Sequence, residues 1–439
     1  MERAGLMPST LLKNARLLDP WTNLDRKGDL LAIDGKIAAV GDSATAPDDA
    51  VIVDCGGHCL APGLIDMRVH LSEPGRAHAE PLAAASRAAA AGGVTSLVAL
   101  PDTDPVLDDV ALVEFVTRQA RKVGLVNTYA YAAATRGLAG RELAEMGLMA
   151  AAGALGFTDG TRAIADAMTM RRALSYARTF DLLIVQHPEE PSLAAGGCAT
   201  EGELATRLGL PGITPLAELI MIERDLRLVE LTGARYHVAH VSTGAAVEAI
   251  HRAKSRGLPV TCDTAPAYFT LNETAIGEYR TFAKLSPPLR SEEDRRAIVE
   301  GLRNGTIDAI ASDHRAEDQD AKRLPYAAAK PGIIGLETLL PLALALHHGQ
   351  GMKLLDVLRK LTQAPADILH LPVGRLAVGA AADLVLFDLD APYRIKAAQF
   401  RSPTRNTPFD GHPVQGRVLR SFVAGRMAYV APGAGGSAP

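Results

Sequence analysis

The stretch LIDMRVHLSEPGRAHAEPLAAASRAAAAGGVTSLVAL at residues 64–100 contains one complete strand–helix–strand unit. A short apolar run at Leu64–Asp66 precedes an alanine-rich helical pattern at Glu80–Ala91, and a run rich in β-branched residues follows at Thr95–Pro101. This alternation is typical of βα units, whose successive strands lie parallel in one sheet. The stretch therefore predicts a parallel sheet covered by helices.

The same alternation continues as far as residue 314. We predict eight strands, at Leu64–Asp66, Thr95–Pro101, Asn127–Ala133, Ala154–Asp159, Leu182–His187, Tyr236–Ser242, Pro259–Pro266 and Ile307–His314. Helical patterns such as Met168–Thr179 and Glu292–Arg303 lie between them. Eight strands that alternate with helices favour an α/β fold of the closed (β/α)8 TIM-barrel type over an open doubly wound sheet.

Both ends of the chain instead show short strand patterns with turn signals such as Asp34-Gly35. The strand patterns are Leu11–Leu18, Leu30–Ile33, Lys36–Val40 and Val51–Val53 before the barrel, and Ala382–Asp388, Gly416–Val423 and Arg426–Val430 after it. We expect the termini to build one small β-sandwich jointly. The expected units are residues 1–60 and 373–432 for its two halves, 61–372 for the barrel, and a flexible tail at 433–439.

Length and composition narrow the functional classes. A chain of 439 residues suits a barrel with a small second module, and 48% hydrophobic with 22% charged residues excludes global disorder. The net charge of −4 argues against nucleic acid or an anionic membrane as a partner. The four cysteines form no Cys-x-x-Cys pair, residues 1–10 lack the basic-then-apolar pattern of a secretion signal, and no run of about 18 apolar residues occurs. We expect a cytoplasmic, oligomeric protein with reduced thiols.

Five polar residues end five different predicted strands: His70, Asp159, His187, His240 and Asp313. In barrels of this kind the active site lies at the carboxyl ends of the strands. Imidazoles and carboxylates that converge there are the ligands that hold zinc and lower the pKa of its bound water. The pattern therefore indicates a metal-hydrolase ancestry.

Each of these residues also has a structural interpretation. His70 alone could be a buried, hydrogen-bonded histidine, Asp159 could form a turn with Gly160, and His240 could belong to the core. Their convergence at one mouth favours the functional interpretation. His237 should face the other side of its strand, so we predict a structural role for it. The same holds for the histidines away from the strand ends, which are His58, His78, His251, His347, His348, His370 and His412.

Several motifs together resemble the dihydroorotase family of cyclic amidohydrolases. They are APGLIDMRVHL (61–71), GGVT (92–95), LPDT (100–103), HVST (240–243), SPPLR (286–290), SDH (312–314), GIIGLE (332–337), GRL (374–376) and ADLV (382–385). The resemblance implies a zinc-dependent hydrolase of pyrimidine biosynthesis that opens a cyclic amide. Hydantoinases and allantoinases share much of the pattern, so it specifies the superfamily more sharply than the substrate.

The resemblance also implies roles for the five strand-end residues. Asp159 matches a metal-bridging carboxylate, His187 and His240 match the histidines of the second metal position, and His70 is the remaining histidine of the first. Asp313 matches the general acid and base that activates water and protonates the leaving nitrogen. Three surviving ligands could still hold one zinc, so we expect zero or one zinc per chain.

The sequence departs from the family at the metal and substrate positions. The first histidine of the family motif Asp-x-His-x-His is Arg68, whose guanidinium has no lone pair and would repel a divalent cation. Ser72 replaces an arginine and Asp102 an asparagine, so a pocket that attracts anions becomes one that repels them. Three other departures remain. Ser286 replaces an asparagine, and Ala267-Tyr268 replaces a histidine pair. In the family segment Asp-His-Ala-Pro-His, the last three residues are replaced by Arg315-Ala316-Glu317.

Two functional hypotheses follow. In the first, the chain is a degenerate, weakly active or inactive dihydroorotase homologue that assembles with aspartate transcarbamoylase, as the resemblance implies. Arg68 would then occupy the space of the missing metal and pair with Asp313 or Asp159. In the second, the chain is an active zinc-dependent dihydroorotase or related cyclic amidohydrolase, in which Arg68 or Arg315 holds the substrate carboxylate from a new direction.

Overall fold

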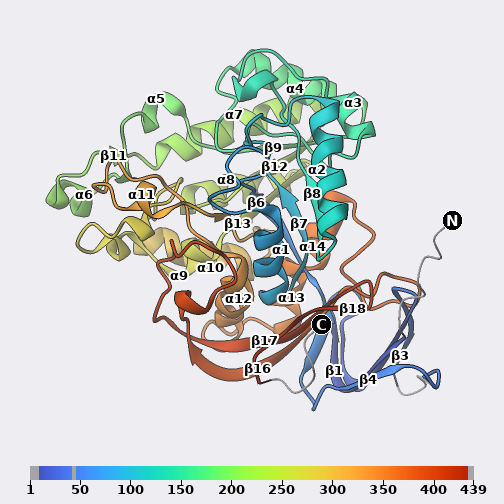
Figure 1. Cartoon of the computed structure of the whole chain (residues 1–439). Helices are drawn as coiled ribbons and strands as arrows, with labels where there is room; N and C mark the ends of the chain where they lie inside the picture. The colour runs from blue at the N-terminus through green and yellow to red at the C-terminus, as the bar shows by residue number, and fades with distance from the viewer. Residues whose placement is uncertain (1–8, 42–45, 434–439) are drawn as a thin grey trace.

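A computed structural model describes residues 9–41 and 46–433 of the chain. It shows a barrel of parallel strands surrounded by helices, with a sheet formed by both termini beneath it (Figure 1). The predicted α/β fold class is therefore confirmed. Residues 434–439 of the expected tail lie outside the described residues.

The barrel consists of two four-stranded parallel sheets, with the orders β15-β6-β7-β8 and β14-β13-β12-β9. The strands are β6 (Leu64–His70), β7 (Val94–Ala99), β8 (Asn127–Ala130), β9 (Leu183–Gln186), β12 (Arg235–Val238), β13 (Val260–Thr264), β14 (Ala309–Ile310) and β15 (His314–Arg315). The last two are pieces of one predicted strand. Because β14 pairs with β13 and β15 pairs with β6, this strand closes the ring.

The predicted strand Ala154–Asp159 is reduced to isolated bridges. Phe157 bridges to Ala132 on one side and to Ile184 on the other. Its main-chain N–H donates to Leu183 O at 2.9 Å. Gly156 interrupts the segment, Gly153 and Gly160 flank it, and glycine weakens strand pairing. The segment still joins β8 to β9, so it occupies the fourth position of the barrel.

Helices cover the barrel between the strands, as Figure 1 shows. The longer ones are α1 (Leu82–Ala91), α2 (Val110–Val123), α4 (Ala167–Thr179), α7 (Leu216–Thr232), α8 (Gly244–Ser255), α10 (Glu292–Arg303), α12 (Leu339–His348), α13 (Leu354–Leu361) and α14 (Gln363–Leu369). The start of α10 illustrates the local chemistry: Ser291 Oγ accepts a hydrogen bond from Asp294 N, and acidic residues fill the first turn. Short helices α3 (Met146–Ala151), α5 (Pro191–Ala194), α6 (Glu203–Leu208), α9 (Pro266–Thr270) and α11 (Gln319–Lys322) lie in the connections.

The terminal strands form one eight-stranded sheet with the order β18-β17-β16-β5-β1-β2-β3, in which β4 also pairs with β1. These strands are β1 (Thr10–Asp19), β2 (Leu24–Ile33), β3 (Lys36–Val40), β4 (Val51–Asp54), β5 (Cys59–Pro62), β16 (Leu384–Arg394), β17 (Pro413–Val423) and β18 (Arg426–Val430). Ile37 N donates to Ala380 O and Ala382 N donates to Gly35 O, both at 2.9 Å, so the sheet curls back on itself. Both halves enclose one apolar core, which confirms the predicted joint β-sandwich.

The close approach of Gly92, at the end of α1, to the main chain of Leu336 allows a test of the packing. A Cβ atom built on Gly92 would lie 2.0 Å from the main-chain oxygen of Leu336. We expect Gly92→Ala to lower the free energy of unfolding by about 2–3 kcal/mol, because main chain must move to make room. Gly349 ends α12 in a similar right-handed conformation, yet a Cβ there would lie 3.3 Å from its nearest neighbour, Ala345 O.

Urea unfolding of both variants measures the difference. Gly349→Ala serves as the control, and we expect it to cost less than about 1 kcal/mol. Equal stability losses in the two variants would contradict the packing of α1 against residue 336.

Candidate active site at the barrel mouth

A buried ion pair occupies the mouth of the barrel. Arg68 in β6 is 1% exposed, and its Nε donates to Asp313 Oδ1 at 2.8 Å. Its Nη2 donates to Gly160 O at 3.3 Å, whereas Nη1 has no hydrogen-bond partner among the described residues. The expected pairing of Arg68 with a mouth carboxylate is thus present, with Asp313 and not Asp159 as the partner.

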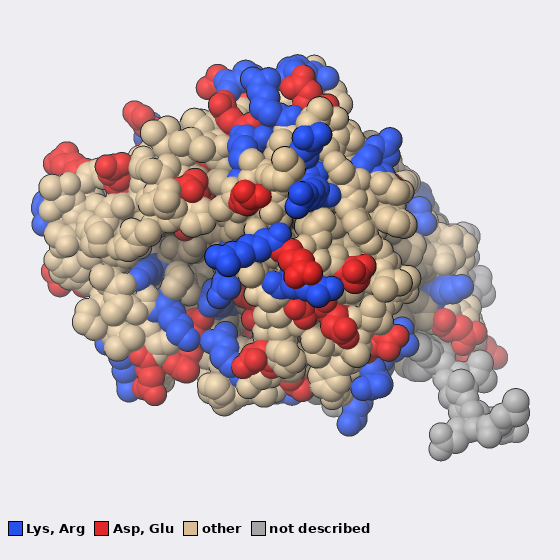
Figure 2. Space-filling view, turned by 90° about the horizontal axis from the view of Figure 1, so that it is seen from above, with Lys and Arg blue, Asp and Glu red and all other residues tan. Residues whose placement is uncertain are grey.

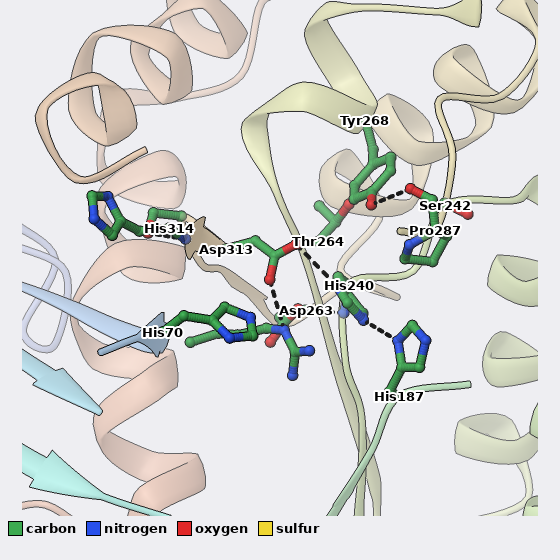
Figure 3. A network of polar contacts seen from close by, with 12 residues as sticks. His70, His187, His240, Ser242, Asp263, Thr264, Tyr268, Pro287, Asp313 and His314 are labelled. Carbon is green, nitrogen blue, oxygen red and sulfur yellow. Dashed lines mark hydrogen bonds and ion pairs between the residues drawn. The ribbon is translucent and has the colours of Figure 1, made fainter. Parts of the chain in front are cut away.

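Asp313 also contacts His240, which in turn contacts His187 from the neighbouring strand. Its Oδ2 lies 3.1 Å from His240 Nδ1, and His240 Nε2 lies 2.7 Å from His187 Nδ1. Figure 3 shows His187, His240 and Asp313 joined in this order. Because a carboxylate only accepts, the Nδ1–H of His240 donates to Asp313, while His240 Nε2 and His187 Nδ1 share one hydrogen bond. Both ring nitrogens of His240 are therefore engaged.

Charge keeps Asp313 ionised. Burial raises the pKa of its carboxyl, but His240 and Arg68 outweigh burial, so the pKa lies well below its usual range. An ionised carboxylate can accept a hydrogen bond or a proton, but it has no proton to give. The pairing with Arg68 thus opposes the general-acid role that the resemblance implies for Asp313.

His70 and Asp102 form a second pair beside the first. His70 Nδ1 lies 2.8 Å from Asp102 Oδ2, and both side chains are largely buried. Burial raises the pKa of Asp102, but His70, Arg315 and Arg68 hold it far below its ordinary value. The Asp102 carboxylate therefore binds a neighbouring imidazole and adds negative charge to the mouth.

Asp159 is directed toward a loop. Its Oδ1 accepts from Thr135 N at 2.9 Å and its Oδ2 accepts from Thr135 Oγ1 at 2.5 Å. Burial raises the pKa of the Asp159 carboxyl, although the hydrogen bonds from Thr135 act in the opposite direction. The structure thus brings His187, His240 and Asp313 together, while Asp159 and His70 each have other partners.

Two of the predicted substrate positions, Ser286 and Arg315, line a small cavity. A space of about 160 Å³ is lined by His70, Thr161, Leu285, Ser286, Asp313, Arg315, Pro331 and Gly332. Arg315 does not point freely into it, because its Nε donates to Glu317 Oε1 at 2.8 Å. Ser72 is buried just beyond the end of β6. Tyr268, at the position of a family histidine, donates to Pro287 O at 2.8 Å (Figure 3).

The sequence reasoning missed Thr135 and Asp263, and it named Glu317 only as a departure from the family segment. Thr135 holds Asp159, Glu317 holds Arg315, and Asp263 accepts from His240 N at 2.6 Å. Asp263 also lies 3.0 Å from His237 Nε2 and so connects that histidine to the mouth. Asp263 could have been found, since it lies near the end of a predicted strand. Thr135 lies in a loop, where no pattern marked it.

The side chains at the mouth do not fit a zinc ion. Within residues 9–41 and 46–433, no group of three or more His, Cys, Asp or Glu side chains is arranged to hold a metal. The reasons are local: His240 uses both ring nitrogens, Asp159 is bound to Thr135, and the Arg68 guanidinium stands beside Asp313. A fixed cation at this place repels a second one.

A closed barrel, a joint terminal sheet and histidines with a carboxylate at the strand ends define a barrel protein of the amidohydrolase type. A family model described as "Dihydro-orotase-like" matches residues 57–246. A dihydroorotase of Anaplasma phagocytophilum (strain HZ) is 45% identical over 422 residues, which cover 95% of this chain and 94% of that protein. A dihydroorotase of Wolbachia sp. subsp. Drosophila simulans (strain wRi) is 46% identical over 419 residues, with 95% and 94% covered. The chain belongs to the dihydroorotase family.

Solved structures agree with the fold. An L-hydantoinase (dihydropyrimidinase) from Arthrobacter aurescens superimposes with a TM-score of 0.84 at 28% identity, and 96% of each chain is covered. The described part of the chain contains no helix that is long and apolar enough to cross a membrane.

Asp66, which lies beneath the mouth, allows a test through the pH dependence of the protein's stability. Its Oδ1 accepts from Ser312 N at 3.0 Å and from Arg68 N at 3.2 Å, while Oδ2 has no hydrogen-bond partner among the described residues. Burial raises its pKa from 3.8 to about 6. Because the folded state disfavours the ionised form, its contribution to stability is present below pH 3.8 and is lost as the pH rises through about 6.

We therefore expect Asp66→Asn to gain stability over the wild type as the pH rises from about 4 to about 7, by about 2 kcal/mol in total. The free energy of unfolding in urea, measured for both proteins across this range, tests the expectation. Parallel pH profiles would show that Asp66 ionises in the folded protein at no cost.

Proposed function

We propose that this dihydroorotase-family protein has a degenerate ring-opening site, is inactive or weakly active, and serves as an assembly partner of aspartate transcarbamoylase. The single observation that supports it most is the buried ion pair of Arg68 and Asp313. The pair places a side-chain cation beside the carboxylate that the family uses as acid and base. That carboxylate is then held ionised between Arg68 and His240.

The electrostatics of the mouth also oppose an anionic substrate. The ionised Asp102 stands where relatives of this type place an asparagine that binds the substrate carboxylate, and Ser72 stands for an arginine. The cavity lined by His70, Asp313 and Arg315 measures about 160 Å³, while a separate space of about 500 Å³ reaches His187. Arg315, which could have replaced the lost cation, is bound to Glu317.

The assembly role rests on the family resemblance and on an intact scaffold around an altered mouth. We propose that the protein works in the cytoplasm within an oligomer, and its four cysteines are free thiols, as a reducing compartment favours. Residues 1–60 and 373–432 would form one unit with the barrel at 61–372. Such a unit offers a partner a rigid surface without requiring chemistry at the mouth.

The second candidate function is an active, zinc-dependent dihydroorotase or related cyclic amidohydrolase. Relatives at 45% identity carry the name dihydroorotase, and His187, His240 and Asp313 are retained side by side. This function requires that a metal displace the Arg68 guanidinium and separate the two histidines. It therefore requires a different arrangement of the mouth from the one described.

Arg68→His distinguishes the two candidates. We expect the wild type to show little or no dihydroorotate turnover even with zinc added. Arg68→His should gain zinc affinity, because it removes a cation and adds a ligand, but little turnover, because Ser72 and Asp102 remain. Zinc titration and an ultraviolet assay of dihydroorotate hydrolysis on the same samples measure both. Arg68→Gln is the control that removes the charge without adding a ligand.

Two results would decide against the proposal. Turnover by the wild type at enzyme-like rates would establish the second candidate. Full turnover by Arg68→His would show that the substrate site is intact and that only the metal position is altered.

The assembly role has its own test. We expect the purified chain and the aspartate transcarbamoylase of the same cell to elute together in size-exclusion chromatography, with a mass by light scattering that equals the sum of both components. The same experiment with Arg68→His should give the same complex, because assembly uses the scaffold. Separate elution at every concentration tested would contradict the assembly role while leaving the degenerate site in place.

A further inference from the structure

A second and larger cavity lies beside the barrel mouth. Its volume is about 700 Å³, and four chain segments line it, near residues 78, 280, 320 and 404. It is distinct from the small cavity at the mouth. Arg315 lines the small cavity and Glu317 lines the large one, so the ion pair between them lies at the boundary.

Hydrogen bonds fix the walls of the large cavity. Thr281 Oγ1 donates to Lys322 O at 2.6 Å, and Lys322 Nζ donates to Lys330 O at 2.7 Å. Asn406 Nδ2 donates to Arg315 O at 2.8 Å, which joins the segment before β17 to the end of β15. Three segments far apart in the sequence are thus held together, so the cavity is a preformed feature of the fold.

Positive charge gathers on these walls without carboxylate partners. Arg280 and Arg323 are exposed, and their guanidinium groups make no ion pair or hydrogen bond within the described parts of the chain. The guanidinium of Arg405 donates only to main-chain oxygens, those of Ser402 and Thr404. The buried ammonium of Lys322 likewise donates to main-chain oxygens, those of Thr281 at 3.2 Å and of Lys330.

The two carboxylates on the walls are already engaged. Glu317 binds Arg315 at 2.8 Å and lies 3.7 Å from Arg76. Asp318 accepts from Ala321 N at 2.8 Å, which caps α11, and lies 4.0 Å from His78. Figure 2 shows Lys and Arg side chains gathered around a hollow on the face that it presents. The cavity therefore has an excess of positive charge on a protein whose net charge is −4.

We propose that this cavity binds a small organic molecule that carries two or more oxyanion groups, either phosphates or carboxylates, through Arg280, Arg323 and Lys322. Guanidinium groups match both kinds of oxyanion in geometry and charge. A volume of about 700 Å³ lies within the range of small-molecule sites and exceeds what a bare inorganic anion fills. Tyr279, whose hydroxyl donates to Leu208 O at 2.8 Å, and Phe282 supply apolar wall for the organic part.

The burial and the lowered pKa of the Lys322 ammonium support the proposal. Burial lowers the pKa of its ammonium to about 7, although Glu317 acts in the opposite direction. An oxyanion in the cavity supplies the counter-charge that the buried ammonium lacks, so its binding favours the protonated form. The site depends on no residue of the barrel mouth, so it stands whether or not the mouth is active.

Calorimetric titration of the purified full chain at low salt tests this site. The probes are inorganic pyrophosphate for phosphates and citrate for carboxylates. We expect at least one of them to bind the wild type, and the one that binds more tightly identifies the group. Arg280→Gln combined with Arg323→Gln should weaken that binding by about tenfold or more, because two charge-assisted contacts are lost.

The control is Arg171→Gln combined with Arg172→Gln, which removes the same charge from exposed positions on α4, outside the cavity. This variant should bind the probe as the wild type does. Equal weakening in both double variants would overturn the proposal, because binding would then follow net charge alone. Failure of both probes to bind the wild type would overturn it as well.

Discussion

The barrel mouth is organised around the requirement that a buried carboxylate have a positive partner. Asp313 is largely enclosed, and leaving it ionised without a counter-charge would cost several kcal/mol. Arg68, from the adjacent strand β6, meets this requirement with a hydrogen bond of 2.8 Å. Once that contact is made, the second oxygen of Asp313 faces His240, and His240 in turn orients His187. One arginine in strand β6 thus explains the arrangement of four side chains.

The consequences for chemistry follow from charge. A guanidinium brings a permanent positive charge but no open coordination position, so it neutralises Asp313 without activating water as a metal would. Asp102 adds a second carboxylate, which His70 binds at 2.8 Å. The charged groups of the mouth are therefore paired with one another, although Arg68 Nη1 and Asp102 Oδ1 have no hydrogen-bond partner among the described residues. Under the proposed function, this pairing leaves few free ligands for a metal and few free cations for a substrate anion.

Much of the fold could be predicted from the sequence because its periodicity is strong. The strand–helix alternation and the turn at Asp34-Gly35 were sufficient for the barrel and the terminal sheet. The ion pair of Arg68 could also be anticipated, since a buried charge needs a partner. The reduction of the fourth strand to bridges at Phe157 was not predicted, because Gly156 within the run and Gly153 and Gly160 beside it act against an otherwise apolar pattern. The orientation of Asp159 depends on Thr135, and the large cavity depends on four chain segments that are distant in the sequence. Neither feature leaves a local pattern in the sequence.

The most direct test of the central claim is the crystal structure of the wild-type protein grown with excess zinc, with anomalous scattering measured at the zinc edge. We predict that the Arg68 guanidinium binds Asp313 and that no anomalous peak lies between His70, His240 and Asp313. An anomalous peak bound by His70, with Arg68 turned away from Asp313, would contradict the proposal that this guanidinium takes the place of the metal.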